Sequence, residues 1–291
     1  MPLQTPNSFG GCGNNPLSLR LRDFVAKLTM ETWRLLIDEP ADGATNMARD
    51  EALLHAHAAG MTLPTIRLYQ WQPACLSLGR FQRSADVNWD ACAHEGVDVV
   101  RRPSGGRALL HADELTYAVV ARADHPLFAG RASILHSYHD ISMALLHGLQ
   151  RLGVAAQLAP APRRRGVSAA CFDTPAAFEL TVAGRKLVGS AQARREGVLL
   201  QHGALPFSPH TARLQALLAC PIPDLNTTMV TLDEALGHPA NVSDVVAALV
   251  AGFEAAWNIT LEPGVLSSNE QALEHELRAT RYATDAWTRM R

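Results

Sequence analysis

The stretch from residue 101 to 117 constrains the fold more than any other part of this 291-residue chain. It reads Arg-Arg-Pro-Ser-Gly-Gly-Arg-Ala-Leu-Leu-His-Ala-Asp-Glu-Leu-Thr-Tyr and lies between the apolar runs 97–100 and 115–120. The pattern predicts a strand, a glycine-bearing turn with basic flanks, and a second strand. Gly105 and Gly106 lack a Cβ, so the backbone there can approach a ligand and present N–H groups to a carbonyl or a phosphate. A tight hairpin with solvated arginines would give the same local pattern.

Further segments accompany this loop in a fixed order from residue 32 to the C-terminus. They are Trp33-Arg34, Asn46 to Leu54, Pro64 to Tyr69, Leu76 to Gly79, Phe81-Gln82, Cys171-Phe172-Asp173, Gly184 to Lys186, Gly189 to Gln192 and Gln201-His202-Gly203. Together with the loop, they resemble the biotin/lipoate ligase and octanoyltransferase superfamily. Arg107 stands where lipoate ligases have a third glycine, and Ala112 where they have an aspartate. With these two departures, the loop resembles that of the branch of cysteine-dependent octanoyltransferases.

The resemblance implies an α/β fold with a mixed, largely antiparallel sheet flanked by helices, which is the fold of biotin/lipoate ligase catalytic domains. Residues 31–291 are expected to form a single catalytic domain with a helical C-terminal tail. Residues 1–30 lack a secretory hydrophobic segment and are expected to be a disordered leader or a misassigned start.

Hydrophobic periodicity places the elements of this domain along the chain. Helices are predicted over 46–59, 87–95, 134–152, 242–257 and 268–280. Strands are predicted over 66–69 and 75–78, and short strands over 177–182, 186–191 and 198–205 are expected to form an antiparallel meander.

Composition excludes several classes of function. A net charge of −2 gives no electrostatic reason to bind nucleic acid or an anionic membrane. No apolar run approaches the roughly twenty residues of a membrane span. The five cysteines are widely spaced without a Cys-x-x-Cys pair, which favours a reducing cytoplasm over a disulfide framework. The histidines form no strong zinc pattern, so no metal site is expected.

Cys171 is the candidate nucleophile, in the small-residue stretch Ser-Ala-Ala-Cys-Phe-Asp-Thr-Pro. A thiolate needs a nearby cation or hydrogen-bond donor, and the ammonium of Lys186 could stabilise it or later accept a proton from an incoming amine. A cysteine is more often a small buried hydrophobe, and Cys75 and Cys92 keep that interpretation. Cys171 is singled out by its similarity to the Cys-Phe-Asp segment of the family, and Lys186 by its similarity to the lysine shared across the superfamily.

The resemblance also implies a substrate-binding set around this pair. Its members are Arg102, Ser104, Gly105, Gly106, Arg107, His111, Gly189, Ser190, Ala191, Gln192, His202 and Gly203. Backbone donors of 104–106 or 189–192 would hold a developing oxyanion. Strand alternation would place Lys186, Val188, Ser190 and Gln192 on one face. His111 is expected to line the site, either as a general base or as a hydrogen-bonded structural histidine, and His202 to shape the pocket floor.

The activity implied by the resemblance is octanoyl transfer. The octanoyl group would move from acyl carrier protein to a thioester on Cys171, and then to a lysine of a lipoyl domain such as the glycine cleavage H protein. Thioester exchange is near isoenergetic, so no cofactor is expected beyond the phosphopantetheine on the carrier. The basic triple Arg163–Arg165 is either a contact for the acidic carrier or a solvated loop.

Other functions remain open at this point. An ATP-dependent lipoate ligase shares the fold and the lysine, and an amidotransferase that moves the acyl group between lipoyl domains shares the cysteine chemistry. A biotin ligase fits less well because its glycine-rich loop has a different pattern. A protein that binds lipoyl domains without catalysis would keep the fold alone.

Overall fold

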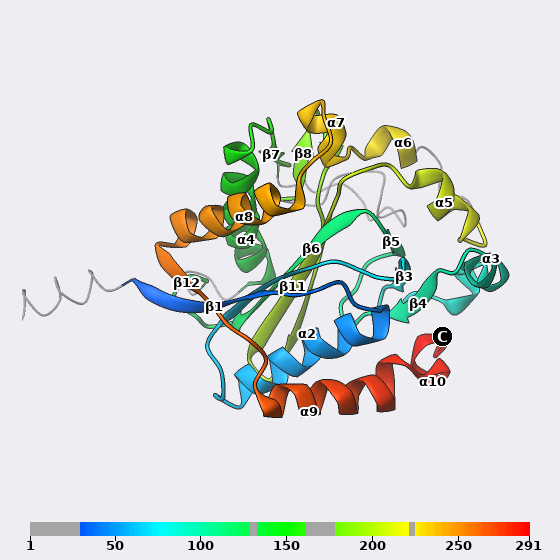
Figure 1. Cartoon of the computed structure of the whole chain (residues 1–291), viewed down its shortest axis with the longest axis horizontal. Helices are drawn as coiled ribbons and strands as arrows, with labels where there is room; N and C mark the ends of the chain where they lie inside the picture. The colour runs from blue at the N-terminus through cyan, green and yellow to red at the C-terminus, as the bar shows by residue number, and fades with distance from the viewer. Residues whose placement is uncertain (1–29, 129–132, 161–177, 221–224) are drawn as a thin grey trace, which may run out of the picture. The chain divides into compact units, whose positions relative to one another are not determined.

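The computed structural model is organised by a six-stranded sheet in the order β10-β11-β6-β2-β1-β12 (Figure 1). The structure describes residues 30–128, 133–160, 178–220 and 225–291. Residues 32–291 form one compact unit. The strands are β1 (Glu31–Ile37), β2 (Thr65–Tyr69), β6 (Glu114–Arg122), β10 (Gly189–Arg195), β11 (Val198–Pro206) and β12 (Ile259–Pro263). β1 and β2 run parallel, whereas β2–β6, β6–β11 and β11–β10 pair antiparallel, which confirms a mixed and largely antiparallel sheet.

Helices cover both faces of this sheet (Figure 1). Because side chains alternate along a strand, β6 supplies both cores. Its Tyr117 and Val119 pack with α4 (Ile134–Arg151) and α8 (Val242–Trp257). Its Ala118 and Val120 belong to the opposite core, with α2 (Gly43–Ala58) and α9 (Ser268–Leu277). These four helices confirm the predictions over 134–152, 242–257, 46–59 and 268–280.

A second, three-stranded sheet carries the glycine loop. Its central strand β3 (Cys75–Leu78) pairs parallel with β4 (Asp98–Arg101) and antiparallel with β5 (Leu109–His111). The two strands predicted on either side of the loop exist as β4 and β6, but they lie in different sheets. The predicted order of strand, turn and strand is confirmed, but the two strands do not pair as a tight hairpin, because β3 satisfies the hydrogen bonds of both β4 and β5.

Two short helices pack on this second sheet and complete its core. They are α3 (Trp89–His94), which confirms the helix predicted over 87–95, and α5 (Thr211–Ala216). Leu76, Leu78 and Leu110 from the sheet meet Cys92 of α3 and Leu214 of α5 in one buried cluster. The wall behind the glycine loop is consequently a packed layer with its own small core.

The predicted meander is divided between two sheets. β7 (Gln157–Leu158), β8 (Leu180–Val182) and β9 (Arg185–Lys186) form a small antiparallel sheet, while β10 and β11 belong to the large one. Leu187 and Val188 are the two residues that separate β9 from β10 in the sequence, and both are buried in the main core. In a continuous strand these neighbours would point to opposite faces, so the break in the strand allows both side chains to be buried in the same core. Residue 177, where the first strand was predicted to begin, lies outside the described residues.

The C-terminal segment reaches back to the glycine loop. After α9, one π-helical turn, η3 (Arg278–Tyr282), leads to α10 (Asp285–Thr288). The buried Arg101 at the end of β4 donates to the carbonyls of Thr288, Gly79 and Gln82, at 2.9, 2.9 and 2.6 Å. One guanidinium therefore joins the C-terminal segment to the turn after β3.

The remaining short helices are η1 (Ser84–Asp86), α6 (Leu225–Thr228) and α7 (Leu232–Leu236). Within the described ranges, no helix is long and apolar enough to cross a membrane.

Candidate active site

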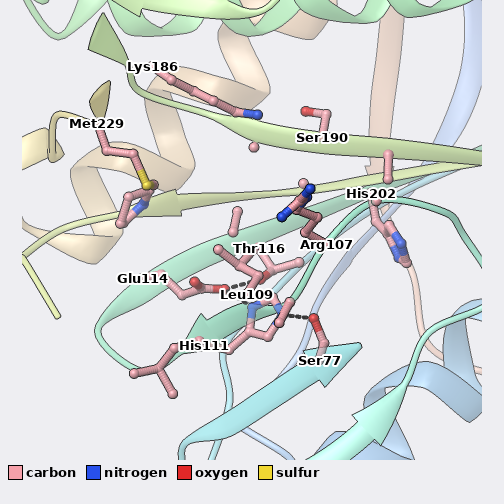
Figure 2. A pocket seen from close by; sticks show the side chains of 18 of the residues that line it. Ser77, Arg107, Leu109, His111, Glu114, Thr116, Lys186, Ser190, His202 and Met229 are labelled. Carbon is pink, nitrogen blue, oxygen red and sulfur yellow. Dashed lines mark hydrogen bonds and ion pairs between the residues drawn. The ribbon is translucent and has the colours of Figure 1, made fainter. Parts of the chain in front are cut away.

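A cavity of about 670 Å³ lies beside the glycine loop, within the range usual for small-molecule sites. Apolar side chains form much of its wall, among them Trp71, Leu109, Ile134, Leu135, Leu214 and Met229. Figure 2 shows Lys186 and Ser190 on one side of the cavity and Ser77 and His111 on the other. The cavity is thus a mostly apolar chamber with a few polar groups on facing walls.

Most of the residues predicted for the site line this cavity. They are Arg102, Gly106, Arg107, His111, Lys186, Gly189, Ser190, Ala191, His202 and Gly203. Ser104, Gly105 and Gln192 do not line it. Cys171 and the triple Arg163–Arg165 lie outside the described residues, so the candidate nucleophile has no described position relative to this wall.

Lys186 forms an ion pair that the sequence interpretation missed. Its Nζ lies 2.6 Å from Oε1 of Glu179, and both side chains are mostly buried. The register of β8 and β9 places Thr181 opposite Lys186, so Glu179 lies two residues away on the same face. The turn Ala183-Gly184 could have revealed this pairing, because a two-residue hairpin fixes the register of its strands.

The β10 wall follows the predicted alternation only in part. Ser190 lines the cavity and its Oγ lies 2.7 Å from the Tyr117 hydroxyl. Gln192, two residues on in the same strand, donates to Gln201 Oε1 at 2.9 Å, and Gln201 donates to the same Tyr117 hydroxyl. Ser190 and Gln192 therefore share a face as predicted, whereas Lys186 lies on the separate strand β9 and Val188 is buried in the break between β9 and β10.

Two phenols of this region stay protonated at neutral pH. Burial raises the pKa of Tyr117 to about 12, and burial also raises the pKa of Tyr138 above its ordinary value. Both groups are therefore neutral hydrogen-bond partners at this wall. Neither is suited to remove a proton from a substrate at that pH.

The buried side chain of Arg102 stabilises the glycine loop through hydrogen bonds to its backbone. Its guanidinium donates to the carbonyls of Gly105, Arg107 and Ser77 at 2.8, 2.7 and 3.0 Å. Burial lowers its pKa to about 10, so the group is still cationic at neutral pH. Gly106 has a φ of +96°, a conformation that glycine adopts without strain.

His111 sits in a chain of buried hydrogen bonds in the cavity wall. Its Nδ1 lies 2.6 Å from Glu114 Oε1, and its Nε2 lies 2.7 Å from Ser77 Oγ. The indole of Trp71 stacks on the imidazole with ring centroids 4.0 Å apart. Glu114 and Ser77 were not predicted as site residues, although Glu114 follows His111 by three positions at the start of a strand.

His202 has a parallel arrangement. Its Nδ1 lies 3.0 Å from Asp50 Oδ2, and its Nε2 lies 2.5 Å from Ser104 Oγ. Burial alone would raise the pKa of Asp50, but the hydrogen bond from His202 and the charge of Arg67 outweigh it and lower that pKa. His202 lines the cavity as predicted, and it links Asp50 to the glycine loop. Among the described residues, no group of three or more His, Cys, Asp or Glu could hold a metal ion.

Comparison with known proteins agrees with this architecture. Residues 42–254 match the family model described as the lipoyl protein ligase A/B catalytic domain. Lipoate-protein ligase A bound with ATP superposes with a TM-score of 0.75 at 24% identity, over 89% of this chain and 99% of that one. A bipartite lipoate protein ligase from Thermoplasma acidophilum gives a TM-score of 0.74 at 23% identity, over 90% and 97%. At such identities the solved structures show the fold alone, which is that of a lipoyl protein ligase catalytic domain.

Curated relatives narrow this class. Octanoyltransferase LipM from Bacillus subtilis is 38% identical over 274 residues, which are 88% of this chain and 98% of the relative. The protein of the same name from Moorella thermoacetica is 40% identical over 273 residues, 90% of this chain and 99% of the relative. The chain belongs to the lipoyl protein ligase A/B catalytic-domain family and, within it, to the octanoyltransferases. This confirms the resemblance deduced from the glycine loop.

Proposed function

We propose that this octanoyltransferase accepts octanoyl from acyl carrier protein as a thioester on Cys171 and passes it to a lysine of a lipoyl domain, such as the glycine cleavage H protein. In this proposal Lys186 is the second catalytic residue. Its ammonium stabilises negative charge on the sulfur and on the carbonyl oxygen as the acyl group is transferred. No metal or cofactor enters either step.

The observation that carries this proposal is a cation at the wall of a mostly apolar chamber. Lys186 lines the cavity together with Leu109, Ile134 and Met229. The apolar walls suit a medium-length acyl chain, and each methylene removed from water contributes about 0.8 kcal/mol. A charge in such surroundings acts on a reacting thioester more strongly than it would in water.

An arginine cluster beside the glycine loop supports an acidic donor protein. The backbone N–H of Arg80 donates to Ser104 O at 2.8 Å, and both Arg80 and Arg281 lie over the Trp287 ring. Arg83 is exposed in the same turn. In the described part of the chain, neither Arg80 nor Arg83 has a salt bridge to a carboxylate. Acyl carrier proteins are acidic, so charge complementarity favours docking on this turn.

The acyl-enzyme is tested by intact-mass spectrometry after mixing the protein with octanoyl-carrier protein without ATP. We expect a gain of one octanoyl group in the wild type and in Cys220→Ala, which removes an exposed thiol, and none in Cys171→Ala. Loading of Cys171→Ala would contradict the proposed nucleophile. Loading only from octanoylated H protein would assign the amidotransferase, and pyrophosphate release with free lipoate and ATP would assign the ligase.

The donor surface has a separate test. Arg80→Glu with Arg83→Glu should raise KM for octanoyl-carrier protein, with a weaker salt dependence, and leave loading by octanoyl-pantetheine unchanged. Arg151→Glu, an exposed change on α4, is the matched control. Equal KM values for the carrier in all three proteins would show that the arginine cluster does not receive the donor.

A further inference from the structure

We propose that Ser77, His111 and Glu114 form a proton relay that deprotonates the acceptor lysine in the second half-reaction. This inference rests on the proposed function, because it needs an acyl-enzyme to discharge. All three residues line the cavity, and they occupy the wall that faces Lys186 in Figure 2.

Glu114 and Arg102 together fix the direction of the relay. The Glu114 carboxylate can only accept, so His111 Nδ1 carries the hydrogen and donates to it. In this tautomer Nε2 has the lone pair, and it accepts the hydrogen of the Ser77 hydroxyl. The Arg102 NH1 group lies 3.2 Å from Ser77 Oγ, and a guanidinium can only donate. One lone pair of Ser77 Oγ is left for a group in the cavity, because Arg102 uses the other.

The surroundings hold this arrangement in place. Thr116 Oγ1 donates to Glu114 Oε1 at 2.5 Å, and Trp71 Nε1 donates to Thr116 Oγ1 at 2.8 Å. The stacked indole of Trp71 fixes the plane of the imidazole. The ionisable groups that face His111 are Glu114, Arg102 beyond Ser77, and the Cys75 thiol across β3. Burial raises the pKa of Cys75, so this thiol is neutral.

The alternative bases in the cavity are less suitable. Lys186 Nζ is paired with Oε1 of Glu179 at 2.6 Å, and the proposed function already uses its charge on the sulfur and the carbonyl oxygen. His202 lines the cavity, but its Nε2 is bonded to Ser104, which does not line it. Of the two Ser–His–carboxylate chains, only the one through Ser77 places its serine at the cavity.

The proton balance is straightforward. The acceptor ammonium first loses one proton to solvent, and the neutral amine attacks the thioester carbon. As the N–C bond forms and the C–S bond breaks, the second nitrogen proton passes to Ser77 Oγ while the Ser77 proton passes to His111 Nε2. Glu114 stabilises the imidazolium until His111 releases that proton to solvent, and the departing thiolate takes up a proton from solvent.

Separating the half-reactions tests the relay. Ser77→Ala and His111→Gln are loaded with octanoyl-carrier protein, and discharge is then followed by intact mass with either the lipoyl-domain acceptor or hydroxylamine. Hydroxylamine is unprotonated at neutral pH and depends little on a base. We expect loading within about threefold of wild type, discharge to lysine slower by about 10²–10⁴-fold, and discharge to hydroxylamine within about threefold. Ser243→Ala, a change at an exposed serine of α8 outside the cavity, is the matched control and should discharge to both like the wild type.

Each other result decides against the relay. Unchanged discharge to lysine in both variants would show that the network is structural. Equal losses with lysine and hydroxylamine would show that the residues shape the cavity and move no proton. Failure of the wild type to load is a different outcome, and it would contradict the proposed function.

Discussion

Gly79 makes the closest approach to the glycine loop, and replacing it by alanine should disable the enzyme. A methyl group on Gly79 would lie 1.8 Å from the carbonyl oxygen of Gly106 and 2.7 Å from its carbonyl carbon. Both contacts are with backbone, so no flexible side chain can yield. Gly79 is also fixed on its other side, because its carbonyl accepts from the buried Arg101 at 2.9 Å.

The geometry sets the size of the effect. An ordinary contact begins at about 3.4 Å, so the Gly106 carbonyl would have to move by about 1.6 Å, the difference between 3.4 and 1.8 Å. Overpacking of this kind costs about 1–3 kcal/mol of folding free energy. A displacement of about 1 Å in a catalytic site lowers rates by about 10²-fold. We therefore expect Gly79→Ala to remain folded, with octanoyl transfer reduced by about 100-fold or more.

The assay is single-turnover loading followed by intact mass, with thermal unfolding measured in parallel. Gly105→Ala is the matched control in the same loop, because a methyl group there meets nothing within 4 Å and its φ is not left-handed. It should keep activity within about twofold and unfold at the wild-type temperature or slightly above. Wild-type activity in Gly79→Ala, or an equal loss in Gly105→Ala, would refute the reasoning.

Three further predictions concern the cavity and the buried charges. A hexanoyl donor lacks two methylenes of octanoyl, which removes about 1.6 kcal/mol of hydrophobic binding free energy, so kcat/KM should be about 15-fold lower than for octanoyl. Equal kcat/KM values for the two donors would mean that the acyl chain is not buried in the cavity. Asp50→Asn leaves Arg67 with less compensation and should cost about 3–5 kcal/mol in urea unfolding, whereas a cost below about 1 kcal/mol would contradict the account of this pair. The pKa of Asp50 is depressed in the folded state, so the stabilisation by its carboxylate is fully present above the ordinary pKa of 3.8 and is lost as the pH falls through the lowered pKa. The free energy of unfolding of the wild type should therefore fall more steeply in acid than that of Asp50→Asn. Arg101→Gln removes the donors that satisfy the carbonyls of Gly79, Gln82 and Thr288, so it should both lower the urea midpoint of unfolding and slow octanoyl loading. Unchanged loading in a destabilised variant would show that the C-terminal segment does not support the glycine loop.

Much of the local structure follows from the sequence alone. Helical spacing located α2, α4, α8 and α9, because the buried stripe of a helix repeats within the helix itself. The strand predictions over 66–69 and 75–78 also hold, although the buried polar residues Arg67 and Ser77 interrupt the apolar residues of these strands. Specific residue types at fixed spacing in the glycine loop also indicated the family. These features depend on neighbours in the chain, so a single sequence is sufficient to find them.

Which strands pair, and which side chains share the cavity, was decided by the tertiary structure. The sequence shows nothing that would place β3 between β4 and β5, or part β9 from β10 at Leu187, since both depend on how remote segments share hydrogen bonds and burial. For the same reason Ser77 reaches His111 from a strand 34 residues away in the sequence, whereas Glu114 is only three positions from His111. Local periodicity fixes the elements, but contacts over long sequence separations require the closed fold, and the polar chains of the cavity wall depend on such contacts between Ser77 and His111 and between His202 and Asp50.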